Sequence, residues 1–382
     1  TLDQAVIRLV TTRMKLGLFD EAEKVAYNTI KYDQVYNKQH KELNLISSRK
    51  SIVLLKNEEE ILPLNKSKIK SIGVIGPNAN NRRALVGNYE GTASEYITVL
   101  EGINQYLGED TEVYYSEGCH LFKEKVQGLA GQNDRLSEVR AVCDMSDVVI
   151  GVFGLDPGLE GEEGDQGNEF ASGDKPDLNL PGLQSKIIKE MYNSGKPVIL
   201  ILLSGSALSL PWEDEHIPAI IQGWYPGAQG GRAIVEVIFG EYSPEGKLPV
   251  TFYRTAEELP EFTDYNMVNR TYRYMNNEAL YPFGYGLSYT DFTLNRVAIN
   301  SDEIIPGKEI TCVAEIQNTG KMVGGETLQV YVKVKKDGAP NWQLKGLKKV
   351  HLKPGEKETV TITLKDGAFG LYNNEGQLIL NE

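Results

Sequence analysis

The stretch "PGLQSKIIKEMYNSGKPVILILLSG", residues 181–205, decides the fold class, because it joins a helical segment to a buried-strand segment. Residues 181–195 predict a helix that stops at Gly195. The unbroken apolar run "PVILILL" comes next and is typical of a strand covered on both faces. A helix followed at once by such a strand indicates one unit of a parallel sheet.

The same alternation extends outward over residues 46–255. Strands that alternate with helices predict an α/β sandwich, in which a mostly parallel sheet is covered on both faces. Open sheets of this kind bind ligands beyond the carboxyl ends of their strands. The expected extended segments are "IKSIGVIGP", "EVYYSEG", "DVVIGVFG", "KPVILILLSG", "AIIQGWYPG" and "GKLPVTFY".

The pattern of apolar and polar residues changes after residue 288. Residues 289–382 contain short alternating strands with turn signals between them, which predicts a β-sandwich of the immunoglobulin or fibronectin type III kind. Residues 256–288, rich in Tyr, Asn, Gly and Pro, predict an ordered connection between the two domains. Within its "NRTYRYM" segment, Arg270 and Arg273 are expected to fix the connection to the sheet.

The first residues predict a separate element. Residues 1–20 show the periodicity of an amphipathic helix that ends near Gly17, and residues 21–45 are expected to form a polar linker. The linker offers no apolar surface for this helix. The helix is therefore expected to pack against something outside the segment that follows it.

The composition restricts the classes of partner. The formal net charge is −13 at pH 7, whereas nucleic acids and anionic membranes require a basic surface. No apolar run is long enough to span a bilayer, and Cys119, Cys143 and Cys312 lack the spacing of a disulfide framework or a metal site. We expect a neutral ligand, with no nucleic acid, membrane, metal or cofactor, while the cellular compartment stays open.

An acidic, glycine-rich loop follows the predicted strand "DVVIGVFG". Residues 154–174, "GLDPGLEGEEGDQGNEFASGD", carry seven carboxylates and no Lys or Arg before Lys175. Three interpretations are open: a solvated loop, a calcium site (although the EF-hand spacing is absent), or a loop that presents one carboxyl as a general acid. Crowding and partial burial raise carboxyl pKa values, and glycoside hydrolysis needs such an acid together with a second carboxylate.

Other reaction motifs are absent from the sequence, including the G-x-S-x-G nucleophile, glycine-rich phosphate loops and histidine metal clusters. Aromatic residues next to glycines do follow predicted strands, in "GNYEGTASEY" (87–96) and "GWYPGAQGG" (223–231). Tyr89 and Trp224 are candidate substrate contacts, because the C–H faces of sugars pack on aromatic rings. Packing in the core or between domains is the alternative for Trp224.

The ordered set of segments resembles glycoside hydrolase family 3 over essentially the whole chain. Within that family, "GLDPGLEGEE" and "TYRYM" are similar to the β-xylosidases, whereas β-glucosidases often have a shorter S-G-E-G form of the loop. The matching segments are "MKLGLFD", "SRKSIVLLKN", "ILPLN", "IGVIGPNA", "GNYEGT", "GLDPGLEGEEGD", "LNLPGLQ", "SGSAL", "WYPGAQGG", "GKLPVTFYR", "TYRYM", "YPFGYGLSYTDF", "QNTG", "LQVYV" and "LKGLKKVHLKPGE".

The resemblance implies a retaining reaction, with an Asp nucleophile on a (β/α)₈ barrel and an acid/base Glu from the α/β sandwich. Matching the loop from Gly154 places the acid/base at Glu160, and the "EGEE" run makes Glu162 the alternative. Asp174 and Lys175 stand where the family commonly has Asp-Arg and are expected to anchor the loop. Lys175 keeps the charge but lacks the bidentate fork of Arg.

The nucleophile motif has no match in this chain, and the resemblance begins at the last helix of the barrel, residues 1–20. We therefore expect the C-terminal part of a longer or split enzyme, inactive alone, with a barrel supplied in cis or in trans. The expected activity removes terminal non-reducing β-linked sugars from oligosaccharides, with β-D-xylosides as the expected substrates. A β-glucosidase, or a non-catalytic carbohydrate-binding module, is the alternative.

Overall fold

The computed structural model describes residues 1–88, 90–131, 133–161 and 175–380. The chain divides into two compact units, Thr1–Asn44 and Leu45–Glu382. In the first unit, helix α1 (Leu2–Lys15) has no buried residue, and three short 3-10 turns follow it. Helix α2 (Lys38–Ser51) begins inside the segment predicted to be a linker, since its polar first turn shows no apolar periodicity.

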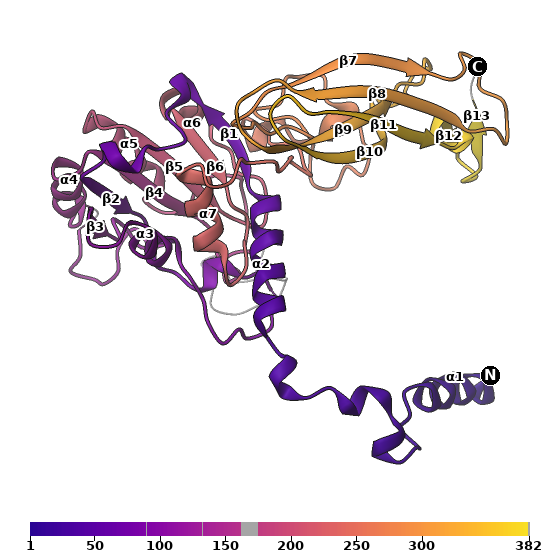
Figure 1. Ribbon diagram of the computed structural model, residues 1–382, viewed down its shortest axis with the longest axis horizontal. Coiled ribbons are helices and arrows are strands. Elements are labelled where there is room, and N and C mark those ends of the chain that lie inside the picture. The colour runs from indigo at the N-terminus through magenta and orange to yellow at the C-terminus, as the bar shows by residue number, and fades with distance from the viewer. Residues whose placement is uncertain (89, 132, 162–174, 381–382) are drawn as a thin grey trace. The chain divides into compact units, whose positions relative to one another are not determined.

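Six strands form one sheet in the order β1-β6-β5-β4-β2-β3 (Figure 1). Five of them pair in parallel, and β1 pairs antiparallel with β6 at the sheet edge, so the predicted mostly parallel sheet is confirmed. The "GKLPVTFY" segment forms only an isolated bridge between Phe252 and Tyr281. The strands are β1 (Val53–Asn57), β2 (Ser71–Ile75), β3 (Glu112–Ser116), β4 (Val148–Gly154), β5 (Val198–Leu203) and β6 (Ala219–Gln222).

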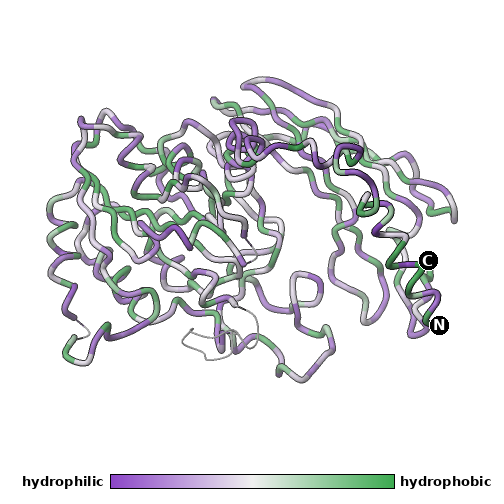
Figure 2. Tube along the Cα trace, turned by 90° about the horizontal axis from the view of Figure 1, so that it is seen from below, coloured by the Kyte–Doolittle hydropathy of each residue, from purple (hydrophilic) through white to green (hydrophobic). Residues whose placement is uncertain are grey.

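Helices cover both faces of this sheet. Helices α4 and α5 pack against one face in a core that includes Phe153 and Leu200, and α3 and α7 pack against the other face with Ile150 and Ile201. In Figure 2 the hydrophobic parts of the trace gather in the strands between these layers. The helices are α3 (Val99–Leu107), α4 (Leu136–Asp144), α5 (Gln184–Asn193), α6 (Pro211–His216), α7 (Gly230–Ile238) and the short α8 (Thr271–Tyr274).

The remaining strands build the predicted β-sandwich. One sheet has the order β11-β8-β7, a second pairs β10 with β9, and β12 pairs with β13, all antiparallel. Its core holds Ile316, Val350 and Leu364 among other apolar side chains. The strands are β7 (Phe292–Ile299), β8 (Ile310–Asn318), β9 (Gly324–Val332), β10 (Gln343–Leu352), β11 (Lys357–Leu364), β12 (Gly370–Tyr372) and β13 (Leu378–Leu380).

The two arginines of the connection do not bind where the sequence placed them. Arg273 Nη2 donates to Gln343 Oε1 of β10 at 2.9 Å, so it fixes the connection to the β-sandwich and not to the parallel sheet. Arg270 donates to backbone carbonyls within the connection, including that of Asp264 at 2.6 Å. Sequence pattern alone does not show which neighbouring domain a connection contacts.

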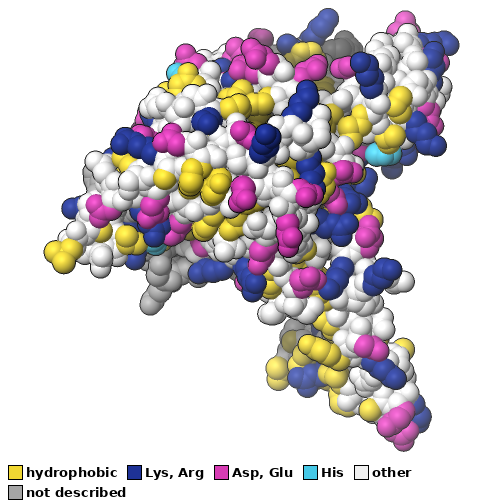
Figure 3. All heavy atoms as spheres, turned by 60° about the vertical axis from the view of Figure 1, so that its left-hand side comes forward, with side chains coloured by type: hydrophobic (Ala, Val, Ile, Leu, Met, Phe, Trp, Pro, Cys, Tyr) yellow, Lys and Arg dark blue, Asp and Glu magenta, His cyan; other side chains and the backbone are white. Residues whose placement is uncertain are grey.

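Surface charge, helix composition and the cysteines complete the description of the fold. On the face drawn in Figure 3, acidic and basic side chains are interspersed, so the net charge of −13 is not gathered into one field there. Among the described residues, no helix combines the length and the apolar composition that a bilayer-spanning segment needs. Cys119 and Cys143 are buried free thiols, and burial raises the pKa of Cys119 to about 12.

Candidate active site

The carboxyl ends of β4, β5 and β6 meet at one edge of the sheet, and polar residues follow each of them. Glu160 comes after β4, Gly205 and Ser206 after β5, and Tyr225 after β6. Because β5 lies between β4 and β6, these segments are neighbours although up to 65 residues separate them in sequence. This edge is where open α/β sheets bind ligands.

The last residue of β4 fixes where the acidic loop leaves the sheet. Gly154 has φ +129°, and a Cβ there would lie 2.1 Å from the carbonyl oxygen of Leu203, so only glycine fits. The buried Gln184 amide accepts from Gly154 N–H and donates to Gly154 C=O, both at 2.8 Å. Asn78 Nδ2 donates to Leu155 C=O at 2.9 Å. The loop therefore starts from a rigid base.

A tight turn then leads to Glu160. Asp156 accepts twice on its backbone carbonyl, from Leu159 N–H at 2.9 Å and from Glu160 N–H at 3.2 Å. Its side chain accepts from Gly158 N–H at 2.8 Å and lies 4.0 Å from Arg83 Nε. Asp156 is only 8% exposed, so these contacts satisfy a carboxylate that would otherwise be costly to bury.

The Glu160 carboxylate accepts three hydrogen bonds from the two neighbouring strand ends. Oε2 accepts from Gly205 N–H at 2.6 Å and from the Tyr225 hydroxyl, and Oε1 accepts from the Ser206 hydroxyl. Each oxygen therefore has at least one donor within the domain. We call these three donors and the carboxylate the Glu160 clamp.

The donors of the clamp are themselves held in place. Buried Gln222, the last residue of β6, donates to Ser204 Oγ at 3.0 Å, and Ser204 Oγ donates to the Ser206 carbonyl at 2.9 Å. Burial, followed by the nearby Glu160 charge, raises the pKa of the Tyr225 phenol above its ordinary value. The phenol therefore keeps its proton and acts as a donor to Glu160.

The absence of a side chain at Gly205 gives the clamp its space. A Cβ at this position would lie 3.0 Å from a ring carbon of Tyr225 and 3.1 Å from Glu160 Oε2. Both distances are tighter than ordinary carbon contacts, so a larger residue would push the ring or the carboxylate away.

Two other residues predicted for the site lie in the described part of the chain. Lys175 Nζ donates to the Asn179 carbonyl at 2.9 Å, and burial lowers its pKa while the charges of Asp177 and Glu160 oppose that change. Trp224 Nε1 donates to the Ser51 carbonyl at 3.1 Å, with its ring edge-on to Phe252. The indole is thus bound within the domain. This agrees with the alternative given above for Trp224, that it packs in the core or between domains.

Trp224 also has φ +59°, a conformation that is rare for a bulky residue, and Tyr225 follows this turn directly. Its role as a substrate contact stays a prediction.

Three further predicted residues, Tyr89, Glu162 and Asp174, lie outside the described residues. Asn88, the residue before Tyr89, donates from Nδ2 to the Glu160 backbone carbonyl at 3.1 Å. Asn88 and the backbone of Glu160 are therefore neighbours in the fold.

Sequence reasoning missed Gly205, Ser206 and Tyr225 as site residues. Their signal was present, because "SGSAL" and "WYPG" each follow a predicted strand, as Glu160 does. Within the described residues, no cluster of three or more His, Cys, Asp or Glu side chains is arranged to hold a metal ion. The arrangement is suited to fixing the base of the acidic loop at the edge where open α/β sheets bind ligands.

Comparisons with known proteins place this architecture in a family. Residues 52–289 match the model of the glycosyl hydrolase family 3 C-terminal domain, and residues 326–382 match that of a fibronectin type III-like domain. A β-xylosidase from Formosa agariphila is 34% identical over 98% of this chain and 51% of its own length. A periplasmic β-glucosidase from Salmonella typhimurium is 32% identical over 98% of this chain and 52% of its own.

A solved structure agrees with these matches. The structure of a β-glucosidase from Erythrobacter marinus superposes with a TM-score of 0.83 at 29% identity, over 96% of this chain and 50% of the other. The chain spans about half the length of the curated relatives it matches. With its α/β sandwich and fibronectin type III-like domain, the chain belongs to glycosyl hydrolase family 3, of which it carries the C-terminal portion.

Proposed function

We propose that this chain is the C-terminal part of a retaining, exo-acting β-glycosidase and supplies its acid/base carboxyl. Family membership supports glycoside hydrolysis. The form of the "GLDPGLEGEE" loop and the relative named as a β-xylosidase favour terminal β-D-xylosides of oligosaccharides as substrates. β-Glucosides are the alternative, since a relative named as a β-glucosidase is nearly as similar at 32% identity.

The observation that carries the proposal is the attachment of the acidic loop at the carboxyl edge of the sheet. The clamp holds Glu160 where open α/β sheets receive ligands, and the residues that follow it include further carboxylates. A general acid must sit within hydrogen-bond reach of the leaving-group oxygen, so a loop with a fixed base is a suitable carrier.

The clamp also supports a division of roles between the two candidate glutamates. A proton donor must turn its carboxyl toward the substrate, whereas both oxygens of Glu160 already accept hydrogen bonds inside the domain. Gly205 N–H can only donate, so it favours a carboxylate that accepts at this position. We therefore assign Glu160 the role of positioning the loop and Glu162, two residues later, the role of acid/base.

A retaining hydrolysis needs a second carboxylate, which attacks the anomeric carbon while the acid protonates the leaving oxygen. Asp156, the nearest described acidic residue before Glu160, already binds Gly158 N–H and faces Arg83, so it is a poor candidate for the nucleophile. The nucleophile is therefore expected from a (β/α)₈ barrel in cis or in trans. The apolar side chains of α1, which are exposed in its own unit, include Leu2, Ile7 and Met14 and are consistent with such a partner.

The proposal is tested by reconstitution. The chain is co-expressed with the N-terminal half of the Formosa agariphila β-xylosidase, and the co-purified pair is assayed on aryl β-D-xyloside and aryl β-D-glucoside. We expect hydrolysis by the pair, faster on the xyloside, and none by the chain alone. A barrel half in which the nucleophilic Asp is replaced by Asn is the matched control and should form the same pair without activity.

Two results would contradict the proposal. Hydrolysis by the chain alone would show that it contains its own nucleophile. An inactive pair that nevertheless co-purifies, under conditions in which the intact relative is active, would show that the chain does not supply the acid/base.

A further inference from the structure

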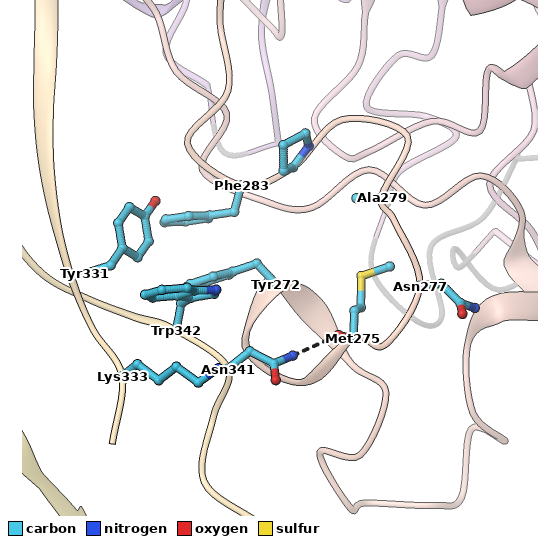
Figure 4. A pocket seen from close by; sticks show the side chains of 10 residues that line it. Tyr272, Met275, Asn277, Ala279, Phe283, Tyr331, Lys333, Asn341 and Trp342 are labelled. Carbon is cyan, nitrogen blue, oxygen red and sulfur yellow. Dashed lines mark hydrogen bonds between the residues drawn. The ribbon is translucent and has the colours of Figure 1, made fainter. Parts of the chain in front are cut away.

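A cavity of about 630 Å³ opens between the connection and the β-sandwich, in the unit Leu45–Glu382. Figure 4 shows aromatic side chains gathered around it from both parts. None of the described residues of the acidic loop, 154–161, is among those that line it. Its lining includes Tyr272, Asn277, Phe283, Tyr331, Lys333 and Trp342.

One wall of the cavity is a fixed set of rings. Tyr272 stacks on Phe283 with ring centroids 4.3 Å apart and planes 11° from parallel, and it meets Tyr331 edge-on at 6.0 Å. The Tyr272 hydroxyl accepts from Leu344 N–H at 3.2 Å, and the Tyr331 hydroxyl donates to Gln329 Oε1 at 2.6 Å. Protein groups already bind both hydroxyls, so the ring faces are the larger part of this wall that a ligand can contact.

Trp342 is held in place while its side chain stays open to solvent. The residue before it, Asn341, is anchored by two hydrogen bonds. Its N–H donates to the Arg273 carbonyl at 2.6 Å, and its Nδ2 donates to the Met275 carbonyl at 2.8 Å. The residue after it, Gln343, is bound by Arg273 at 2.9 Å. Nevertheless, 51% of Trp342 is exposed. The backbone on both sides of Trp342 is therefore anchored, so the exposed indole is presented from a defined position at the rim.

The rim of the cavity is polar and carries a positive charge. The Lys333 ammonium lies 5.4 Å from the centroid of the Trp342 ring, and the exposed Asn277 amide lies at the other side of the opening. No carboxylate lines the cavity among the described residues, although the chain as a whole has a net charge of −13. The volume and the mixture of aromatic lining with few polar groups are those of a small-ligand site.

We propose that this cavity binds a β-linked oligosaccharide. The aromatic faces match the C–H faces of sugar rings, and the amide and ammonium groups of the rim match sugar hydroxyls. An open site lined by Trp342 holds a chain of sugars from its side and does not enclose a terminal residue. The class of ligand rests on the proposed glycosidase function, but the cavity would bind it without catalysis.

The test is calorimetric titration of the 382-residue chain with xylohexaose and with cellohexaose, alongside the change in tryptophan fluorescence. We expect measurable binding of at least one of them, and a loss of more than about tenfold in affinity in Trp342→Ala, because exposed aromatic anchors carry most of such binding. Tyr372→Ala is the matched control, since Tyr372 is 74% exposed on β12 and does not line the cavity. Asn277→Ala should weaken binding less than Trp342→Ala.

Binding that persists unchanged in Trp342→Ala would overturn the proposal, as would the absence of heat and fluorescence change with both sugars. Circular dichroism and a melting curve establish that Trp342→Ala is folded. The result is independent of the reconstitution assay: an inactive pair that still binds xylohexaose through Trp342 rejects the proposed function and keeps this site.

Discussion

Two glutamates of this chain are each surrounded by several donors, but the donors differ in kind. Glu160 accepts from neutral groups at the end of the sheet, namely the Gly205 N–H and the hydroxyls of Ser206 and Tyr225. Glu245, 1% exposed, lies between the α/β domain and the β-sandwich and faces cations. The two glutamates therefore differ in role according to their partners: neutral donors surround Glu160, and cations surround Glu245.

The partners of Glu245 come from both domains. Lys50 Nζ and Lys349 Nζ each lie 3.2 Å from Oε1, and His351 Nδ1 lies 3.3 Å from Oε2. The Tyr242 hydroxyl donates to Oε1 as well. Burial alone would raise the pKa of Glu245, but the Tyr242 hydroxyl and the Lys349 and Lys50 ammonium groups outweigh burial and lower it. Burial lowers the pKa of Lys349, and the charge of Glu245 opposes that change.

At Glu245 a cluster of cations joins the two domains, whereas at Glu160 neutral donors hold the base of a loop. Removing Glu245 leaves like charges together at the domain joint, so the cost should appear in stability. Removing a donor of Glu160 leaves the rest of the domain intact, so the cost should appear in the orientation of the acidic loop.

The largest effect on stability is expected from Glu245→Gln. We expect the free energy of unfolding to fall by about 3 kcal/mol, because the variant leaves Lys50 and Lys349 without their buried counter-ion. Urea denaturation at pH 7 measures it. Glu358→Gln, at an exposed position on β11, is the control and should change stability by less than about 0.5 kcal/mol.

The stability difference between the wild type and Glu245→Gln should also depend on pH. Since folding lowers the pKa of Glu245, its contribution is present above the ordinary carboxyl value of 4.5 and is lost as the pH falls through the lowered value. The difference in unfolding free energy between the wild type and Glu245→Gln should therefore shrink below about pH 4.5. A difference that stays constant from pH 7 to pH 3 would show that the charge of Glu245 does not stabilise the joint.

Tyr225→Phe should have a smaller effect on stability and a clear effect on the site. It removes one of two donors to Glu160 Oε2, so we expect a loss of about 1–2 kcal/mol in unfolding free energy. In the reconstituted enzyme kcat should fall more than KM changes, because the loop carrying the acid is less well positioned. Tyr289→Phe is the matched control: its hydroxyl donates to the Val237 carbonyl at 3.0 Å, away from the loop. Equal kcat in both variants would reject the positioning role of the clamp.

Gly205→Ala should have the smallest effect. The added Cβ would crowd the Tyr225 ring and Glu160 Oε2 at 3.0 and 3.1 Å, and a shift of a few tenths of an ångström costs about 1 kcal/mol. We expect a modest decrease in melting temperature and in kcat. Gly128→Ala, where an added Cβ meets nothing within 4 Å, should leave both unchanged. If Gly205→Ala retains wild-type kcat, the clamp tolerates displacement and does not set the loop.

The sequence predicted the layers of the fold because each layer has its own period. The apolar run of β5 and the helix before it identify a parallel sheet, and the short alternating strands after residue 289 identify the β-sandwich. The antiparallel direction of β1 was not predictable, because a short apolar run pairs equally well in either direction. The contact of Arg273 with Gln343 depends on how the domains join, which local pattern does not contain.

The candidate site was predictable only in part. The acidic loop stood out by its composition, and the family resemblance singled out Glu160 as the acid/base candidate, with Glu162 as the alternative. The structure shows specific hydrogen-bond partners for the Glu160 carboxylate, and its catalytic role stays a prediction. Those partners lie on other strands, so their identity follows from strand order and not from any local motif. The neutral donors, not the crowd of carboxylates, are what argue for a positioning role at Glu160.

The most direct test of the assignment compares Glu160→Gln with Glu162→Gln in the reconstituted enzyme, using aryl β-xylosides with good and poor leaving groups. We predict that Glu162→Gln loses about 10²–10⁴-fold on the poor leaving group. With the good leaving group, whose departure needs no acid, azide should attack the xylosyl-enzyme and restore turnover, forming the β-xylosyl azide. Glu160→Gln should lose less, melt at a lower temperature and show no recovery with azide. Azide recovery in Glu160→Gln, with near wild-type activity in Glu162→Gln, would contradict the assignment and make Glu160 the acid/base.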